Sequence, residues 1–280
     1  MAVKNLPADA SPVSFLQTVA WRLRRHMLAM ARRQGAGYIA QGLGIADVLA
    51  ALYFHELRHD PARPDWPGRD RFLLSTGHYS IALWAMLAEA GVIPLAELAS
   101  YGADDSRLDM STLDTTPGVE MTGGSLGHGL GQAIGMALAL RLQGSDSRVF
   151  VELSDGEMQE GATWEGAMAG GHFGLDRLVA LIDCNGIQAD GALVLHMEPV
   201  ADKWRAFGWE TTEIDGNDMA QVVNALHGAR SANRRPKAIV LRTIPGKGIA
   251  TLEQRERAHF VRIEPDEWDM LTRELEAAHG

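Results

Sequence analysis

The segment from Arg148 to Asp190 constrains the fold of this 280-residue chain more than any other. Its ends, 149–153 and 178–183, are apolar runs of strand length, and residues 163–173 between them can form a helix. Two strands joined by such a crossover are commonly parallel neighbours, so their carboxyl ends emerge side by side. The segment therefore predicts a βαβ unit of a parallel sheet.

Polar residues follow both predicted strands. Asp155 and Gly156 come after the first strand, and Asn185 and Gly186 after the second. A carboxylate and an amide oxygen brought together suit Mg2+, which prefers oxygen ligands and keeps part of its shell for phosphate and water. The glycines permit a tight turn that makes the carbonyl of Ile187 a third candidate ligand. Taken alone, each dipeptide is more typical of an ordinary βα turn than of a metal site.

The rest of the chain continues the alternation of strands and helices. Further strands are expected at 71–75, 208–216 and 236–244. Residues 35–44 read as a glycine-rich loop, with Asp47 in the first turn of the helix that follows. This pattern predicts an α/β fold, a parallel β-sheet flanked by helices on both faces. A flexible lead is expected at 1–12, and residues 13–280 are expected to form a single domain. Within that domain, helices are expected at 13–33, 45–57, 79–91, 94–101, 127–142, 200–207, 219–230 and 266–278.

Charge and composition exclude several classes of function. The formal net charge of −10 argues against a nucleic-acid surface, because phosphate binding depends on clustered Lys and Arg. No apolar stretch has membrane-spanning length, no secretory signal is recognisable, and the single Cys184 fits a reducing compartment, so a cytoplasmic location is expected. One short basic run is expected on a solvated helix face: Arg22, Arg24, Arg25, Arg32 and Arg33.

Three motifs in order resemble the cofactor-binding motif of transketolase and other thiamine diphosphate enzymes. They are DGEMQEG from Asp155, WEGAM from Trp164 and LIDCNGIQADG from Leu181. In that family an Asp-Gly pair, followed about thirty residues later by Asn, holds Mg2+ and the cofactor diphosphate. The resemblance implies a thiamine diphosphate-binding fold with thiamine diphosphate and Mg2+ as cofactors. It also implies Asp155, Asn185 and the Ile187 carbonyl as metal ligands.

The resemblance covers roughly Arg22 to Glu264 and implies further site residues. His78, in RDRFLLSTGH, matches a histidine that reaches the diphosphate and the reacting centre. His259 matches, more loosely, a histidine that faces the cofactor. Glu160 matches a glutamate that links to the catalytic glutamate of a partner, so the implied catalytic residues are Glu160, His78 and His259. The other implied cofactor-binding residues are Gly124, Leu126, Gly156 and Glu157, beside the metal ligands.

Four departures from the family pattern bear on substrate choice and turnover. Ser154 stands where the family usually has Gly, and Tyr38 stands where it has a substrate-facing His. Tyr38 either packs the loop or contacts substrate. The His-Pro motif expected between 106 and 117 is missing, and Phe260 replaces the glycine that usually follows His259. Loss of two imidazoles predicts altered substrate choice, and a non-catalytic binding subunit with the same fold is an alternative.

The resemblance is to the diphosphate-binding third of a full transketolase. Fewer than forty residues follow the strand at 236–244, too few for a further domain of ordinary size. The predicted function is therefore the amino-terminal subunit of a split transketolase, which transfers a two-carbon ketol unit with a partner chain that carries the pyrimidine-binding domain. A heterotetramer is expected. Alternatives are a subunit of a 2-oxo acid decarboxylase, a relative of deoxyxylulose phosphate synthase and, more distantly, a nucleotide-binding oxidoreductase.

Overall fold

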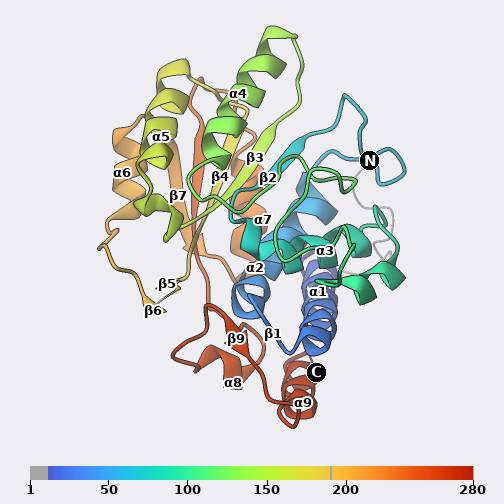
Figure 1. The fold of residues 1–280 in the computed structure, drawn as a ribbon. Coiled ribbons are helices and arrows are strands. Elements are labelled where there is room, and N and C mark those ends of the chain that lie inside the picture. The colour runs from blue at the N-terminus through green and yellow to red at the C-terminus, as the bar shows by residue number, and fades with distance from the viewer. Residues whose placement is uncertain (1–11, 190, 280) are drawn as a thin grey trace.

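A computed structural model describes residues 12–189 and 191–279. Its centre is a five-stranded sheet in the order β2-β3-β4-β8-β7, in which every neighbouring pair is parallel (Figure 1). The predicted βαβ unit is confirmed, because β3 pairs with β4 from Val149 and Leu178 to Ser154 and Asp183. The strands are β2 (Arg71–Leu74), β3 (Val149–Ser154), β4 (Leu178–Cys184), β7 (Glu210–Asp215) and β8 (Lys237–Arg242).

Helices cover both faces of the sheet, as predicted (Figure 1). In β4, Val179 and Leu181 face one apolar core, whereas Ala180 and Ile182 face the other. Strands buried on both faces read as continuous apolar runs, which is why 178–183 carries so clear a strand signal. The first face is covered by α1 (Pro12–Gln34), α2 (Ile39–Ala51), α3 (Ser80–Glu89) and α7 (Met219–Gly228), and the second by α4 (Gly129–Leu142), α5 (Gly161–Phe173) and α6 (Val200–Ala206).

Short elements complete the fold. β1 (Ala36–Gly37) pairs antiparallel with β9 (Val261–Arg262), which brings a late segment of the chain beside an early one. The predicted flexible lead lies outside the described residues, except that Pro12 begins α1. Within the described part of the chain, no helix is long and apolar enough to cross a membrane. The remaining elements are a π-helix at Leu52–Glu56, 3-10 turns at Gly77–Tyr79, Leu95–Ser100 and Glu157–Gln159, the hairpin β5 (Ile187–Gln188) and β6 (Gly191–Ala192), α8 (Ala250–Glu253) and α9 (Trp268–Ala277).

The helix α2 begins earlier than the sequence suggests. The predicted loop at 35–44 is helical from Ile39 onward, so Asp47 lies well inside the helix and not in its first turn. The glycines serve close packing: a Cβ on Gly42 would lie 2.9 Å from side-chain atoms of Met27 and Ile81. Glycine in a helix is tolerated where it allows such an approach.

The basic run on α1 is not wholly solvated. Arg24 is buried, and its guanidinium donates to both carboxylate oxygens of Asp47 at 3.3 and 2.6 Å. The prediction of a solvated face is therefore wrong for Arg24, because α2 packs over it and supplies the countercharge.

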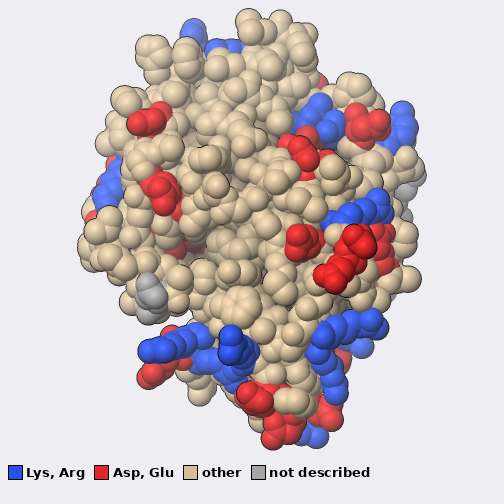
Figure 2. Space-filling model, viewed as in Figure 1, with Lys and Arg blue, Asp and Glu red and all other residues tan. Residues whose placement is uncertain are grey.

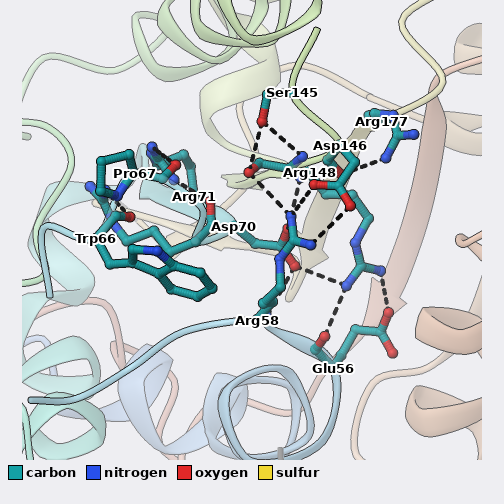
Figure 3. A network of polar contacts seen from close by, with 12 residues as sticks. Glu56, Arg58, Trp66, Pro67, Asp70, Arg71, Ser145, Asp146, Arg148 and Arg177 are labelled. Atoms are coloured by element: carbon teal, nitrogen blue, oxygen red, sulfur yellow. Dashed lines mark hydrogen bonds and ion pairs between the residues drawn. The ribbon is translucent and has the colours of Figure 1, made fainter. Parts of the chain in front are cut away.

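A network of ion pairs lies at the amino ends of β2 and β3 (Figure 3). Arg148, which precedes β3, binds the carboxylate of Glu56 and donates to that of Asp70 at 3.0 Å. The side chains of Glu56 and Asp70 are 0% and 2% exposed. Arg58 adds a two-pronged contact to Asp146 at 2.8 and 3.0 Å. This network fixes one end of the sheet and leaves the carboxyl end for the candidate site.

Candidate functional site at the carboxyl edge of the sheet

Asp155 and Asn185 directly follow β3 and β4, as predicted. Asp155 is 3% exposed; its Oδ1 accepts a hydrogen bond from the amide of Gly156 at 2.8 Å, and its Oδ2 one from the amide of Gly186 at 2.7 Å. Gly186 has a φ of +75°, a conformation that glycine adopts without the crowding a Cβ would cause. The turn after β3 is thereby joined directly to the turn after β4.

The amide group of Asn185 has a defined orientation. Its nitrogen donates to the hydroxyl of Tyr79 and to Oδ2 of Asp183, each at 2.7 Å. Its oxygen accepts from the amide of Ile187 at 3.1 Å and so lies over the turn. An amide oxygen in this arrangement keeps a second lone pair, which a cation can use.

The surroundings of Asp155 suit a cation. Burial raises the pKa of Asp155 to about 7, Asp183 adds to this rise, and the amides of Gly186 and Gly156 oppose it. Within the described residues, no group of three or more His, Cys, Asp and Glu side chains could hold a metal ion. A site here would therefore combine one carboxylate with an amide and a backbone carbonyl. That set of oxygen donors fits Mg2+, which is often bound by one carboxylate together with water and phosphate.

Glu157 is fully buried beside this turn and holds the glycine-rich loop in front of α4. Its Oε1 accepts from the amide of Gly127 at 2.7 Å and from the hydroxyl of Ser75, which itself accepts from the amide of Gly129 at 3.0 Å. Burial raises the pKa of Glu157. The hydroxyl of Ser154 accepts from the amide of Glu157 at 3.0 Å, so this turn accommodates the side chain that departs from the family's glycine.

The glycine-rich loop packs against the segment that follows β2. A Cβ on Gly77 would lie 2.5 Å from the amide nitrogen of Gly124, and one on Gly123 would lie 2.7 Å from Cα of Gly77. Neither position has room for a side chain. Gly124 is exposed and Leu126 half-buried, so both lie at the loop surface. Backbone amides in such loops can receive phosphate groups.

Four rings gather beside these loops. Tyr38 packs edge-on against His78 at 5.0 Å, His259 at 5.4 Å and Phe260 at 5.0 Å between ring centroids. The two imidazoles lie 5.2 Å apart. Burial lowers the pKa of His78 to about 3, with a contribution from His259, and burial also lowers the pKa of His259. Both histidines are therefore neutral near pH 7.

Contacts between distant parts of the chain assemble this ring cluster. Gly37 pairs with Val261, which sets Tyr38 beside Phe260. The buried side chain of Gln41 donates to the carbonyl of His259 at 2.8 Å. The structure thus brings His78 and His259 together.

Glu160 immediately precedes α5 and is exposed. A Cβ on Gly127 would lie 2.8 Å from that of Glu160, so this residue lies against the glycine-rich loop. Glu160 is therefore near the surface of the same group of turns that contains Asp155, Glu157 and Asn185.

Sequence reasoning missed two residues of this site, Tyr79 and Asp183. The hydroxyl of Tyr79 donates to Oδ2 of Asp183 at 2.7 Å, and both side chains are 1% exposed. Asp183 gives a usable signal, because it is a charged residue inside an otherwise apolar strand. Tyr79 gives none, because nothing in its local sequence shows that its hydroxyl reaches β4.

Comparisons with known proteins place the chain in one family. Residues 17–278 match the family "Transketolase, thiamine diphosphate binding domain". The chain is 54% identical to a transketolase family protein of Sinorhizobium fredii, covering 92% of this chain and 94% of the relative. It is 39% identical to the 6-deoxy-6-sulfo-D-fructose transketolase subunit SqwG of Clostridium sp., covering 93% and 96%. It is 33% identical to one subunit of the apulose-4-phosphate transketolase of Phocaeicola vulgatus, covering 94% of each.

Solved structures of longer transketolases share the fold. The transketolase of Campylobacter jejuni superposes with a TM-score of 0.89 at 28% identity, covering 96% of this chain and 43% of that protein. A Pichia stipitis transketolase in complex with sedoheptulose 7-phosphate gives 0.87 at 27% identity, covering 94% and 41%. The chain thus spans about two fifths of these enzymes. It belongs to the transketolase family and corresponds to the thiamine diphosphate-binding domain.

Proposed function

We propose that this chain is the diphosphate- and Mg2+-binding subunit of a two-chain transketolase. The enzyme would transfer a two-carbon ketol unit from a ketose donor to an aldehyde acceptor. The observation that carries this proposal is the direct link between the Asp155 and Asn185 turns at the carboxyl edge of adjacent strands. The ring cluster supports the proposal because it is connected to these turns. His78 belongs to the cluster, and the next residue, Tyr79, accepts a hydrogen bond from the amide of Asn185.

Each residue then has a definite task. Asp155, Asn185 and the carbonyl of Ile187 would hold Mg2+, and the amides of the glycine-rich loop and His78 would hold the diphosphate. When bound, thiamine diphosphate supplies the carbon nucleophile of the reaction. The neutral imidazoles of His78 and His259 can exchange protons with substrate hydroxyl groups.

A partner chain would supply the pyrimidine-binding half of the site. Glu160 is exposed at the start of α5, where its carboxyl group can meet a carboxyl group of the partner and share a proton. The face of the molecule drawn in Figure 2 is largely uncharged at its centre, with charged side chains mostly toward its margins, as at the centre of many protein interfaces. Two relatives are themselves named as subunits. A heterotetramer with two copies of each chain is the proposed assembly.

The test combines this chain with a candidate pyrimidine-binding subunit, and measures ketol transfer and mass by light scattering. We expect activity only in the mixture. Glu160→Gln should lower turnover by about tenfold or more while it leaves cofactor affinity nearly unchanged. The exposed Glu256 offers a matched control, Glu256→Gln. Robust activity of the chain alone would refute the two-chain proposal.

A non-catalytic binding subunit is the second candidate. Three departures from the family pattern favour it: Ser154, Tyr38 at a family histidine position, and the missing His-Pro motif. Calorimetry with thiamine diphosphate and Mg2+ in the presence of the partner separates the two, because a catalytic subunit binds the cofactor to saturation and a scaffold does not.

A further inference from the structure

A closed triangle of hydrogen bonds lies behind the candidate cation site. The amide nitrogen of Asn185 donates to the hydroxyl of Tyr79 and to Oδ2 of Asp183, and the same hydroxyl donates to the same Oδ2. All three distances are 2.7 Å. The triangle joins the turn after β2, the end of β4 and the candidate ligand.

The chemistry of this triangle dictates which end of the amide faces the site. Oδ2 of Asp183 already accepts a hydrogen bond from the hydroxyl of Tyr79, and an accepting oxygen pairs with the amide nitrogen of Asn185 and not with its oxygen. A flipped amide would set its oxygen against the carboxylate and leave buried acceptors facing each other. The oxygen must therefore point away, to the side where it accepts from Ile187.

Asp183 is itself held in place from a third strand. Its Oδ1 accepts a hydrogen bond from the hydroxyl of Thr243, just after β8. Asp183 pairs in register with Ser154 of β3 and Leu241 of β8, so its backbone is fixed within the sheet. A carboxylate that is 1% exposed and accepts from three side chains has little freedom to move.

We propose that Tyr79 and Asp183 are positioning residues, which fix the side chain of Asn185 with its oxygen toward a cation beside Asp155. This inference rests on the proposed function, because it takes Asn185 as a ligand of Mg2+. Partners behind metal ligands commonly contribute a factor of about 10 to 100 to metal affinity. Tyr79 and Asp183 thus act through Asn185 and not by contact with the metal.

The experiment measures how Mg2+ supports the binding of thiamine diphosphate, by calorimetry on the full chain with its partner. Tyr79→Phe removes one hydroxyl and should raise the apparent Kd for Mg2+ by about tenfold. Tyr53→Phe is the matched control, because Tyr53 is also buried but packs against His59 and Phe72. It should leave the Kd unchanged.

A second cation separates positioning from general loosening of the fold. Mg2+ demands near-ideal octahedral geometry, whereas Ca2+ accepts varied coordination. Tyr79→Phe should therefore lower the affinity for Mg2+ more than the affinity for Ca2+. Thr243→Val removes the hydrogen bond to Oδ1 of Asp183 and should also lower the affinity for Mg2+. Thermal melts check that each variant folds. If Tyr79→Phe does not fold, the same measurement can be made on Thr243→Val.

The outcomes distinguish this inference from the proposed function. Mg2+ affinity that is unchanged in Tyr79→Phe and Thr243→Val, but reduced in Asn185→Ala, would overturn the positioning role and leave the metal site intact. Affinity that is also unchanged in Asn185→Ala and Asp155→Ala would overturn the metal site itself. Equal losses for Mg2+ and Ca2+ would also count against the positioning role.

Discussion

The amide of Gly186 donates to Oδ2 of Asp155 at 2.7 Å, so the turn after one strand is fastened to the carboxylate that follows its neighbour. The bond spans 31 residues of sequence but only one strand spacing, because β3 and β4 are adjacent and parallel. This bond holds the proposed oxygen ligands together at one edge of the sheet. The metal-site prediction follows directly.

We predict that Asp155→Ala abolishes metal-dependent cofactor binding, and that Asn185→Ala weakens it less. Asp155 contributes the only charge in the proposed ligand set, which would balance Mg2+ together with the diphosphate. Calorimetric titration with thiamine diphosphate, with and without Mg2+, measures the effect. Circular dichroism provides the control for folding. Unchanged affinity in both folded variants would show that the metal is held elsewhere.

The second prediction concerns His78 and acid stability. Its pKa is lowered to about 3 by burial and by His259, whereas an unfolded histidine titrates near 6.5. As pH falls below 6.5, the unfolded chain takes up a proton that the folded chain refuses until about pH 3, so stability is lost over this window. At pH 5 the loss due to His78 should be roughly 2 kcal/mol.

Urea unfolding at pH 7 and pH 5 gives the change in the free energy of unfolding between the two pH values. The contribution of His78 is the difference between this change in the natural chain and in His78→Gln. The variant should lose less stability between the two pH values. The imidazole resonances of His78 should not titrate between pH 5 and 8. A midpoint near pH 6 for those resonances would contradict the prediction.

The third prediction concerns the ion pairs at the opposite end of the sheet. Arg148→Met should reduce the free energy of unfolding by about 3 kcal/mol, because it removes a charge partner from the buried Glu56 and Asp70. The loss stays at the low end of the usual range because Arg230 still donates to Glu56 at 2.8 and 2.9 Å. Cofactor affinity should be unchanged, since the network lies at the amino ends of the strands.

Urea unfolding and calorimetry together check that prediction. Arg205→Met is the control, because Arg205 forms an exposed pair with Asp202 three residues away and should change stability by less than about 1 kcal/mol. A stability loss as small as that of the control would mean that the buried network contributes little.

Local sequence predicted those features that depend on neighbouring residues. The strands at 149–153 and 178–183 were readable because both faces of the sheet are covered, and the crossover rule then placed Asp155 beside Asn185. Features made by distant residues were not readable. Tyr79 and Asp183 are 104 positions apart, and the pairing of Arg24 with Asp47 depends on how closely α2 packs on α1. No local pattern shows such contacts.

The last prediction concerns Tyr38 and Phe260, which replace a histidine and a glycine of the family pattern. Tyr38 contacts both imidazoles, and Phe260 is 42% exposed and packs edge-on on Tyr38. Together they form an aromatic wall, two packed rings at positions where the family pattern has a histidine and a glycine. A site built to hydrogen-bond a substrate hydroxyl discriminates strongly for it, so loss of that imidazole should relax or redirect the preference among sugars.

Tyr38→His should therefore raise kcat/KM for ordinary ketose phosphates by about tenfold or more in the assembled enzyme, and Phe260→Gly should enlarge the range of acceptors used. Cofactor affinity should stay constant, because neither side chain belongs to the proposed metal or diphosphate contacts. Phe173→Gly is a matched control, since Phe173 is 43% exposed at the far end of α5. Competition between pairs of donors, and between pairs of aldehydes, gives the ratios of kcat/KM. Two outcomes would show that the aromatic wall does not set specificity. One is that the natural chain already uses ketose phosphates with the efficiency of ordinary transketolases. The other is that Tyr38→His changes KM for the cofactor and leaves the ratios of kcat/KM between substrates unchanged.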